Sequence, residues 1–288
     1  DEYDTAFFDK RSKFMHYKPN ILIINNIEFD HADIFEDINS IIKSFHHLVR
    51  LVPKTGHIIY DCNDRNIKKL FKLGNWSYST PLSLKSNNNI KWNLTYKKNK
   101  YFLNKKELTT ELIGIHNFKN AALAIITASI LKIPLTQSFN AMKEFSGVRR
   151  RMEKIHEIKK NDKIKSNNIK IYDDFAHHPT EISYSISSIK RKFKGKKVLS
   201  ICEIRSNSML QGVHRNDLFN ALKISDLSLV VSNKKLDWKF SNEKNKKITM
   251  LNSYQKINKY VKENINNIDL ILIMTNADSK NILKYIKK

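Results

Sequence analysis

Apolar positions in the first half of the chain follow two different spacings. Residues 20–26 form a short apolar run bounded by polar residues, which predicts a buried strand. Residues 35–52 carry apolar side chains three, four and seven positions apart, the pattern of one helix face, and Pro53 follows them. The same two patterns predict a strand at 57–60, a helix at 63–72, a β-hairpin at 90–96 and 101–103, and helices at 117–133 and 136–145, with Thr136 as the last N-cap.

After Gly147 the pattern becomes a regular alternation of strands and helices. Strands are predicted at 169–172, 198–201, 227–231, 248–251 and 270–275, separated by helices at 180–193, 214–223 and 254–263 and followed by a C-terminal helix. Strict alternation favours a parallel sheet covered by helices on both faces, an α/β fold. We place a domain boundary near residue 148 and interpret residues 159–168 as an exposed polar loop.

Composition supports a folded protein with a basic surface. The 288 residues suffice for about two domains, and 41% hydrophobic residues are too many for a disordered chain. The net charge of +24 raises the question of nucleic-acid binding. The lysines are scattered and arginine, which base and phosphate recognition favours, is scarce. Solvated surface lysine is therefore the preferred interpretation, and nucleic-acid binding the less favoured one.

Several classes of site and location are excluded. The six glycines are too far apart for a G-x-G-x-x-G or a G-x-x-x-x-G-K-[ST] phosphate loop within these residues. Cys62 and Cys202 form no C-x-x-C pair, which argues against a disulfide framework and fits a reducing cytoplasm. No apolar run is long enough for a membrane span. The acidic N-terminus, without Met, suggests a chain taken from a longer protein.

Two polar clusters in the first half suggest ligand contacts. His31 lies between Asp30 and Asp33 shortly after a predicted strand, where a divalent metal could bind. The alternative is that Asp30 or Asp33 caps the next helix. His116, Asn117 and Asn120 begin an Ala-rich helix, and Asn amides offer the donor and acceptor that suit an adenine edge. The alternative here is helix capping by Asn117.

Two further clusters follow strands of the predicted parallel sheet. Asp173, Asp174, His177 and His178 directly follow one strand, and Pro179 marks the start of a helix. Ionisable groups crowded in this way are costly unless a ligand, a metal or a helix N-terminus compensates, so we favour a functional role. Arg205 follows the next strand and could hold a carboxylate or phosphate through two hydrogen bonds, or be an ordinary surface arginine.

Together these segments resemble the Mur ligase family, and within it the murein peptide ligases. The resemblance spans essentially the whole chain and rests on several motifs in the family's order: DEYDTAFFDKRSKF, NIEFDHADIFEDI, FHHLVRLVP, GIHNFKNAALAI, FSGVRRRME, YDDFAHHPTEI and IRSNSM. It implies residues 1–147 as the later part of a central ATPase domain and residues 148–288 as a doubly wound, mostly parallel C-terminal domain.

The activity that the resemblance implies is an ATP-dependent ligation in peptidoglycan recycling. ATP, with Mg²⁺, would phosphorylate the carboxylate of UDP-N-acetylmuramate, and the amine of L-alanyl-γ-D-glutamyl-meso-diaminopimelate would attack the acyl phosphate. The motifs assign His31 to the metal site, His116, Asn117 and Asn120 to adenine, Arg150 (or Arg151) to the interdomain hinge, Asp174 to the ribose, and His177, His178 and Arg205 to the peptide amine and carboxylates.

Three departures from the family pattern qualify this expectation. The phosphate loop and a metal-ligating Glu belong upstream of Asp1, and residues 276–280 replace a glycine-rich loop. We therefore expect no ATP turnover from these residues alone. The alternatives are a non-catalytic remnant that binds nucleotide or RNA weakly, and a ligase of UDP-N-acetylmuramate and alanine. The sequence indicates no oligomeric state.

Overall fold

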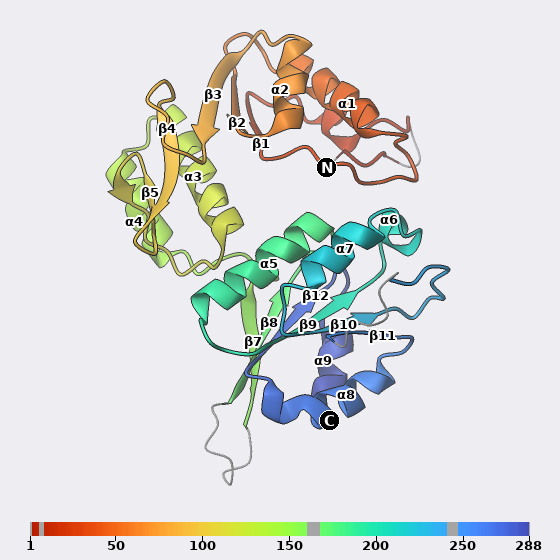
Figure 1. The fold of residues 1–288 in the computed structure, drawn as a ribbon. Helices are drawn as coiled ribbons and strands as arrows, with labels where there is room; N and C mark the ends of the chain where they lie inside the picture. Colours follow the sequence, from red (N-terminus) through yellow and green to blue (C-terminus); the bar gives the residue numbers. More distant parts are fainter. Residues whose placement is uncertain (1, 6–8, 160–167, 241–246, 288) are drawn as a thin grey trace. The chain divides into compact units, whose positions relative to one another are not determined.

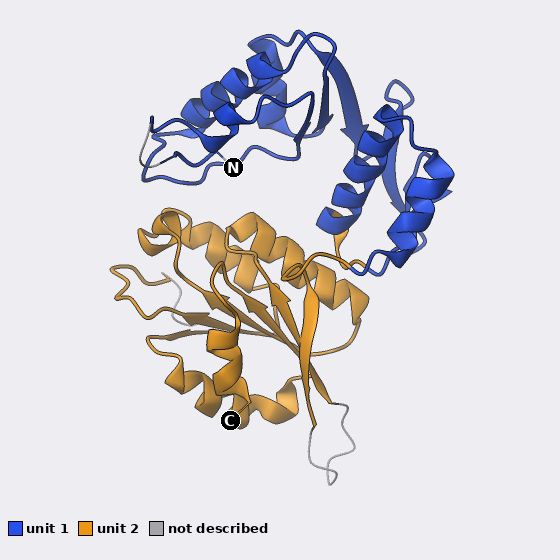
Figure 2. Cartoon of the chain, turned by 180° about the vertical axis from the view of Figure 1, so that it is seen from behind, with its two compact units in different colours: residues 1–111, 116–146 blue, residues 112–115, 147–288 orange. Residues whose placement is uncertain are grey.

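The computed structural model describes residues 2–5, 9–159, 168–240 and 247–287, so nearly all of the predicted polar loop at 159–168 lies outside the described residues. The chain divides into two compact units (Figure 2). Unit 1 comprises residues 1–111 and 116–146, and unit 2 comprises residues 112–115 and 147–288. The chain passes from unit 1 to unit 2 between residues 146 and 147, beside the boundary predicted near residue 148. The assignment of the short segment 112–115 to unit 2 was not predicted.

Unit 1 contains a six-stranded sheet whose order follows the sequence. Its strands are β1 (Ile21–Ile24), β2 (His57–Asp61), β3 (Tyr78–Ser83), β4 (Trp92–Lys97), β5 (Lys100–Leu103) and β6 (Lys106–Glu107). The pairs from β1 to β4 are parallel, and those from β4 to β6 are antiparallel. The predicted hairpin is the pair β4–β5, and its two turn residues, Lys98 and Asn99, both have positive φ, as tight hairpin turns require.

The helices of unit 1 are α1 (Ile38–Leu51), α2 (Arg65–Lys72), α3 (Ile115–Ile130) and α4 (Leu135–Glu144), with a 3₁₀ turn, η1, at Lys13–His16. The apolar face of α1 packs with α2 on β1 and β2 in a single buried cluster. The side chain of Asp37 caps α1 in a capping box with Ser40. The alternative prediction, that Asp30 or Asp33 caps this helix, is therefore wrong. Thr136 is also not the cap of α4, because that helix begins directly after Pro134.

Unit 2 contains a six-stranded sheet of order β11-β10-β9-β12-β8-β7. The strands are β7 (Glu153–Ile158), β8 (Ile169–Asp174), β9 (Val198–Glu203), β10 (Leu227–Val231), β11 (Ile248–Leu251) and β12 (Leu270–Met274). All pairs are parallel except β7–β8, which is antiparallel. The central strands are buried along their whole length, as expected for strands covered on both faces.

Helices cover both faces of this sheet (Figure 1). One core holds α5 (Pro179–Lys192), α6 (Asn207–Leu210) and α7 (Arg215–Leu222), and the other holds α8 (Gln255–Asn264) and α9 (Lys280–Ile286), beside a 3₁₀ turn, η2, at Ile265–Asn267. Alternate residues of β9 enter opposite cores: Val198 faces the first and Leu199 the second. The predicted doubly wound α/β fold is confirmed. Among the described residues, no helix is both long and apolar enough to cross a membrane.

Candidate active site

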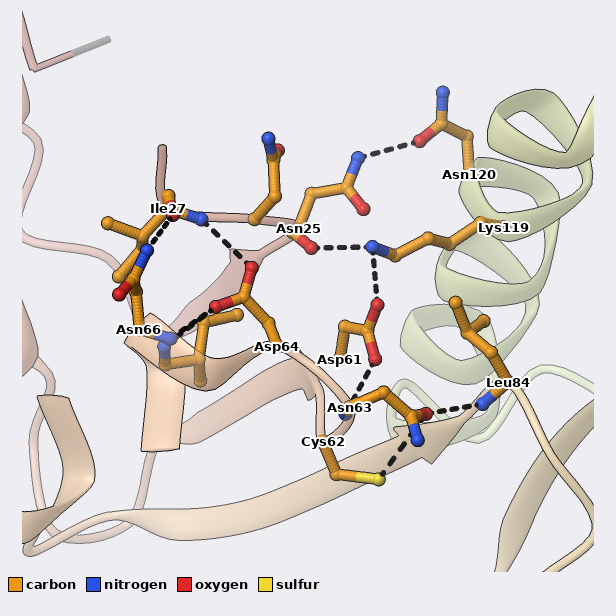
Figure 3. Close-up of polar contacts among 12 residues, drawn as sticks. Asn25, Ile27, Asp61, Cys62, Asn63, Asp64, Asn66, Leu84, Lys119 and Asn120 are labelled. Carbon is orange, nitrogen blue, oxygen red and sulfur yellow. Dashed lines mark hydrogen bonds and ion pairs between the residues drawn. The ribbon is translucent and has the colours of Figure 1, made fainter. Parts of the chain in front are cut away.

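The carboxyl ends of β1 and β2 in unit 1 are joined by a lysine from α3 (Figure 3). The Nζ atom of Lys119 lies 2.7 Å from Oδ2 of Asp61, the last residue of β2. The same Nζ atom donates a hydrogen bond of 2.7 Å to the carbonyl oxygen of Asn25, which follows β1. The side chains of Lys119 and Asp61 are only 13% and 7% exposed, so this is a nearly buried ion pair. It fixes the start of α3 at the sheet edge where open α/β proteins bind ligands.

Asn120 lies beside this ion pair. The Nδ2 atom of Asn25 donates a hydrogen bond of 3.0 Å to Oδ1 of Asn120, while Oδ1 of Asn25 is buried and has no hydrogen-bond partner among the described residues. His116 and Asn117 lie in the first turn of α3, and Asn117 is 5% exposed. Because α3 begins at Ile115, Asn117 does not cap it. Of the three residues predicted to face adenine, Asn120 contacts the strand edge through Asn25.

The loops around this edge are tied together by carboxylate and amide side chains. Asp64 caps α2 through the backbone N–H groups of Asn66 and Ile67 and also accepts from the N–H of Ile27. Asn66 donates in turn to the carbonyl of Ile27. Asp61, Asp64 and Lys119 are not among the site residues predicted from the sequence. Asp61 directly follows an apolar run, and that was the only local signal for it.

His31 lies in a left-handed backbone conformation with φ of 54°. Its Nε2 atom is 3.4 Å from a carboxylate oxygen of Glu2, and its ring meets that of Tyr3 edge-on. The Tyr3 hydroxyl donates to Asp33, and Asp30 accepts from the N–H of His31. In the described part of the chain, no group of three or more His, Cys, Asp or Glu side chains is placed to hold a metal. His31 and Glu2 therefore do not by themselves form the oxygen-rich shell that Mg²⁺ prefers.

Two neighbouring carboxylates end β8 in unit 2. Asp174 is 1% exposed and accepts hydrogen bonds from the N–H groups of Met152 and Ala176. Burial raises the pKa of Asp174 to about 6. Asp173 accepts from the Ser279 hydroxyl, and its pKa is also raised, mainly by burial. The fold therefore holds two carboxyl groups at the carboxyl end of the sheet whose charged forms are disfavoured by burial.

Arg150 pairs with one of these carboxylates, that of Asp173. Its Nε atom lies 3.3 Å from Oδ2 of Asp173, and its guanidinium donates a hydrogen bond of 2.7 Å to the carbonyl of Thr275, which follows β12. Its backbone has a φ of 60° and donates to Glu153. Arg150 therefore links the start of unit 2 to the ends of β8 and β12.

A second cluster joins the ends of β9 and β12. Glu203, with a side chain only 2% exposed, accepts hydrogen bonds from the hydroxyls of Thr275 and Tyr254. Burial, together with the bond to Glu203, raises the pKa of Tyr254 to about 12. Arg205 lies 3.5 Å from the same carboxylate, and its own side chain is 50% exposed. The buried carboxylate thus orients Arg205 while part of its guanidinium stays open to a ligand.

The two predicted histidines lie at the start of α5. His178 is the N-cap, its Nδ1 atom accepting from the N–H of Thr180, and its ring lies edge-on to that of His214. Nδ1 of His177 is 3.2 Å from the carbonyl of Phe175 and 3.7 Å from the carboxylate of Glu181. The fold therefore gives His178 a helix-capping role in addition to any contact with a ligand.

The predicted residues fall into two sets. His31, His116, Asn117 and Asn120 belong to unit 1, and Arg150, Asp174, His177, His178 and Arg205 belong to unit 2. Within each unit the polar side chains gather where parallel strands end, the edge at which α/β sheets bind ligands. A buried Lys–Asp pair with an amide pair in unit 1, and an Arg beside buried carboxylates in unit 2, can bind polar, charged ligands.

Residues 5–128 match the model of the Mur ligase middle domain. The chain is 36% identical over 244 residues to the UDP-N-acetylmuramate–L-alanyl-γ-D-glutamyl-meso-2,6-diaminoheptandioate ligase of Haemophilus influenzae, with 83% of this chain covered. The protein of that name from Escherichia coli is 38% identical over 247 residues. The chain belongs to the Mur ligase family. The matches span 52% and 51% of those two relatives, so this Mur ligase chain corresponds to about half their length.

Solved structures agree with this assignment. A murein peptide ligase from Psychrobacter arcticus superposes with a TM-score of 0.69 at 30% identity, over 99% of this chain and 61% of that one. The UDP-N-acetylmuramate–alanine ligase of Thermotoga maritima gives a TM-score of 0.67 at 20% identity, over 95% of this chain and 60% of that one, a likeness of fold alone. The two sheets of this Mur ligase chain thus have the architecture of Mur ligase middle and C-terminal domains.

Proposed function

We propose that this chain forms the nucleotide-facing and peptide-facing parts of an ATP-dependent ligase. The ligase would join UDP-N-acetylmuramate to L-alanyl-γ-D-glutamyl-meso-diaminopimelate. The observation that carries this choice is the higher similarity to ligases named for the tripeptide: 36% and 38% identity, against 27% to 30% for those named for alanine. We assign residues 1–147 to the middle domain and residues 148–288 to the C-terminal domain.

In unit 2, Arg205 is the group we propose for binding the incoming peptide. The tripeptide carries several carboxylates, and an arginine guanidinium matches a carboxylate with two parallel hydrogen bonds. Glu203 holds Arg205 from the buried side, which reduces the conformational freedom that the arginine would lose on binding. His177 and His178 follow β8 at the same edge, and we propose them for the side of the peptide amine.

In unit 1, the amide pair Asn25–Asn120 fits a purine edge. Asn25 holds Oδ1 of Asn120, and the exposed Asn120 amide can present its Nδ2 donor to a ring nitrogen of adenine. When bound, ATP would supply the phosphoryl group that activates the muramyl carboxylate. We propose that His116 and Asn117 support this site, and we propose Arg150 and Asp174 as further nucleotide-binding residues.

His31 is proposed only as one contact of a magnesium ion. The carboxylate beside its ring, that of Glu2, does not complete a site, so no step of the reaction is derived through the ion from these residues. The proposed reaction uses ATP and a nucleotide sugar, which are cytoplasmic compounds, and we infer a cytoplasmic location. The proposed binding partners are the two substrates.

Titration calorimetry with the tripeptide and with L-alanine tests the peptide assignment. We expect the chain to bind the tripeptide and L-alanine to bind at least about tenfold more weakly. Loss of a two-bond contact costs on the order of 2–3 kcal/mol, so Arg205→Lys should weaken tripeptide binding by roughly 30- to 150-fold. Arg215→Lys, at an exposed arginine on α7, is the matched control. Equal effects of the two substitutions would rule out the proposed role of Arg205.

A further inference from the structure

Unit 2 contains a cavity of about 510 Å³ that none of the residues assigned above lines. It lies where β10 and β11 end: Ser232 follows β10, Leu251 is the last residue of β11, and Asn252 follows it. Its walls are apolar and combine three aromatic with three aliphatic side chains: Phe219, Trp238 and Phe240 with Leu236, Ile248 and Met250. The volume is in the usual range for small-molecule sites, and the position is again at the carboxyl ends of parallel strands.

The aromatic walls are fixed by the surrounding structure. The indole N–H of Trp238 donates a hydrogen bond of 2.9 Å to the carbonyl of Leu210, at the end of α6. Trp238 packs against Gly212, where an added Cβ would lie 2.7 Å from the indole. Phe240 contacts both Trp238 and Phe219, with ring centroids 5.5 Å and 5.4 Å apart. A ligand would therefore meet a preformed surface and would not have to order it.

The charged side chains that line the cavity are all lysines. Lys234, Lys235, Lys239 and Lys256 line it, and no Asp or Glu is among the described lining residues. The Ser232 hydroxyl donates to the carbonyl of Lys234 and accepts from its N–H, which fixes the turn that carries two of these lysines. Four ammonium groups over an apolar floor create a positive potential that attracts an anion and repels a cation.

We propose that this cavity binds a small organic anion with a flat apolar body. The body would lie against Trp238, Phe240 and Met250, and the anionic group would meet the lysines. A purely apolar ligand would leave the four ammonium groups without a counter-charge, and a fully polar anion would leave the aromatic walls facing water. The proposal does not depend on the ligase function, because the cavity and the proposed peptide contacts use different residues.

Two fluorescent probes that share one aromatic body test this proposal. 8-Anilinonaphthalene-1-sulfonate is an anion, and N-phenyl-1-naphthylamine is the same body without the sulfonate. We expect the anion to bind at one site per chain, at least about tenfold tighter than the neutral probe. The double variant Lys234→Gln/Lys235→Gln should lower the affinity for the anion by at least about fivefold. Lys192→Gln/Lys194→Gln, two exposed lysines at the end of α5, remove the same charge elsewhere.

The indole N–H signals of the three tryptophans locate the probe. The signal of Trp238 should shift on titration, while those of Trp76 and Trp92, both in unit 1, should not. Three results would each overturn the proposal: equal affinity for the two probes, equal loss of affinity in the two double variants, or no shift of the Trp238 signal at saturation.

Discussion

At the scale of single residues, Asp174 shows how the fold sets the chemistry of a predicted site residue. Its carboxyl group is buried, and two backbone N–H groups hold it at the end of β8. Burial penalises the charged form more than these bonds favour it, so the pKa is raised to about 6. At acidic pH the group is therefore neutral in the folded protein at values where an exposed aspartate is already charged.

This difference has a consequence for stability. Because the folded-state pKa lies above the unfolded-state value, the folded protein loses stability as pH rises from about 4 to about 6. The asparagine in Asp174→Asn cannot ionise, so the stability of this variant lacks that pH dependence. The free energy of unfolding of the wild type, relative to that of the variant, should therefore fall across this window by on the order of 3 kcal/mol at most. Urea unfolding at several pH values measures it, with the exposed Asp237→Asn as control. A difference independent of pH would contradict the assignment.

The ion pair between Lys119 and Asp61 predicts a large effect of removing one charge. Lys119→Met would leave the Asp61 carboxylate almost buried without its cation, which typically costs about 3–5 kcal/mol. The control is Lys143→Met at an exposed position of α4, where we expect a change within about 0.5 kcal/mol. Chemical denaturation, followed through the signals of Trp76 and Trp92 in unit 1, compares the stability of the two variants. Similar midpoints would show that the pair adds nothing to stability.

Local sequence showed some of the candidate site and not the rest. The positions of Asp174 and Arg205 at the carboxyl end of the sheet could be predicted, because each lies at or just after the end of an apolar strand and the ends of parallel strands share one edge. Other contacts of the candidate site join distant segments: Thr275, after β12, donates to Glu203, and Lys119 of α3 pairs with Asp61. No local pattern carries that pairing, because it arises only when the strands have assembled. The site contacts could therefore not be read from the sequence.

At the scale of elements, strongly apolar segments were predicted well and half-exposed strands were missed. The five predicted strands of unit 2 correspond to β8 to β12. β3, with the sequence YSTPLS, contains Pro81 and three hydroxyl side chains from Ser and Thr, and β7, with the sequence EKIHEI, is a partly exposed antiparallel edge strand. Neither has the apolar run from which buried strands are recognised, because neighbours in the fold, and not local sequence, stabilise them.

Gly212 offers a test of how α6 and the aromatic wall are joined. It has φ of 73°, and a Cβ there would meet the Trp238 ring at 2.7 Å. Gly195 has φ of 81° with nothing near its Cβ position, so Gly195→Ala measures the backbone cost alone, about 1–2 kcal/mol. Gly212→Ala should cost about 1–3 kcal/mol more, by forcing the indole away. Chemical denaturation compares the stability of the two variants. Equal losses of stability would mean that the Trp238 ring moves away from the added Cβ without measurable cost.

At the scale of the whole molecule, the two units carry different groups of the proposed site residues. Unit 1 carries the amide pair and the buried Lys–Asp pair, and unit 2 carries the arginines and buried carboxylates. The chain corresponds to about half the length of its curated relatives. The 288 residues contain no glycine spacing of a phosphate-binding loop. Substrate choice, however, lies in unit 2 if Arg205 and its neighbours bind the peptide. It can be measured once the phosphate-binding function is supplied.

The most direct measurement is the rate at which UDP-N-acetylmuramate, Mg-ATP and either the tripeptide or L-alanine are ligated. The catalyst is this chain fused to the portion of the Haemophilus influenzae relative that lies outside the match, and the 288 residues alone are the control. We expect the fusion to ligate the tripeptide with a kcat/KM about 100-fold or more above that for L-alanine, and the control to form no product. A fusion that prefers L-alanine, or that accepts neither amine while hydrolysing ATP normally, would contradict the proposed function.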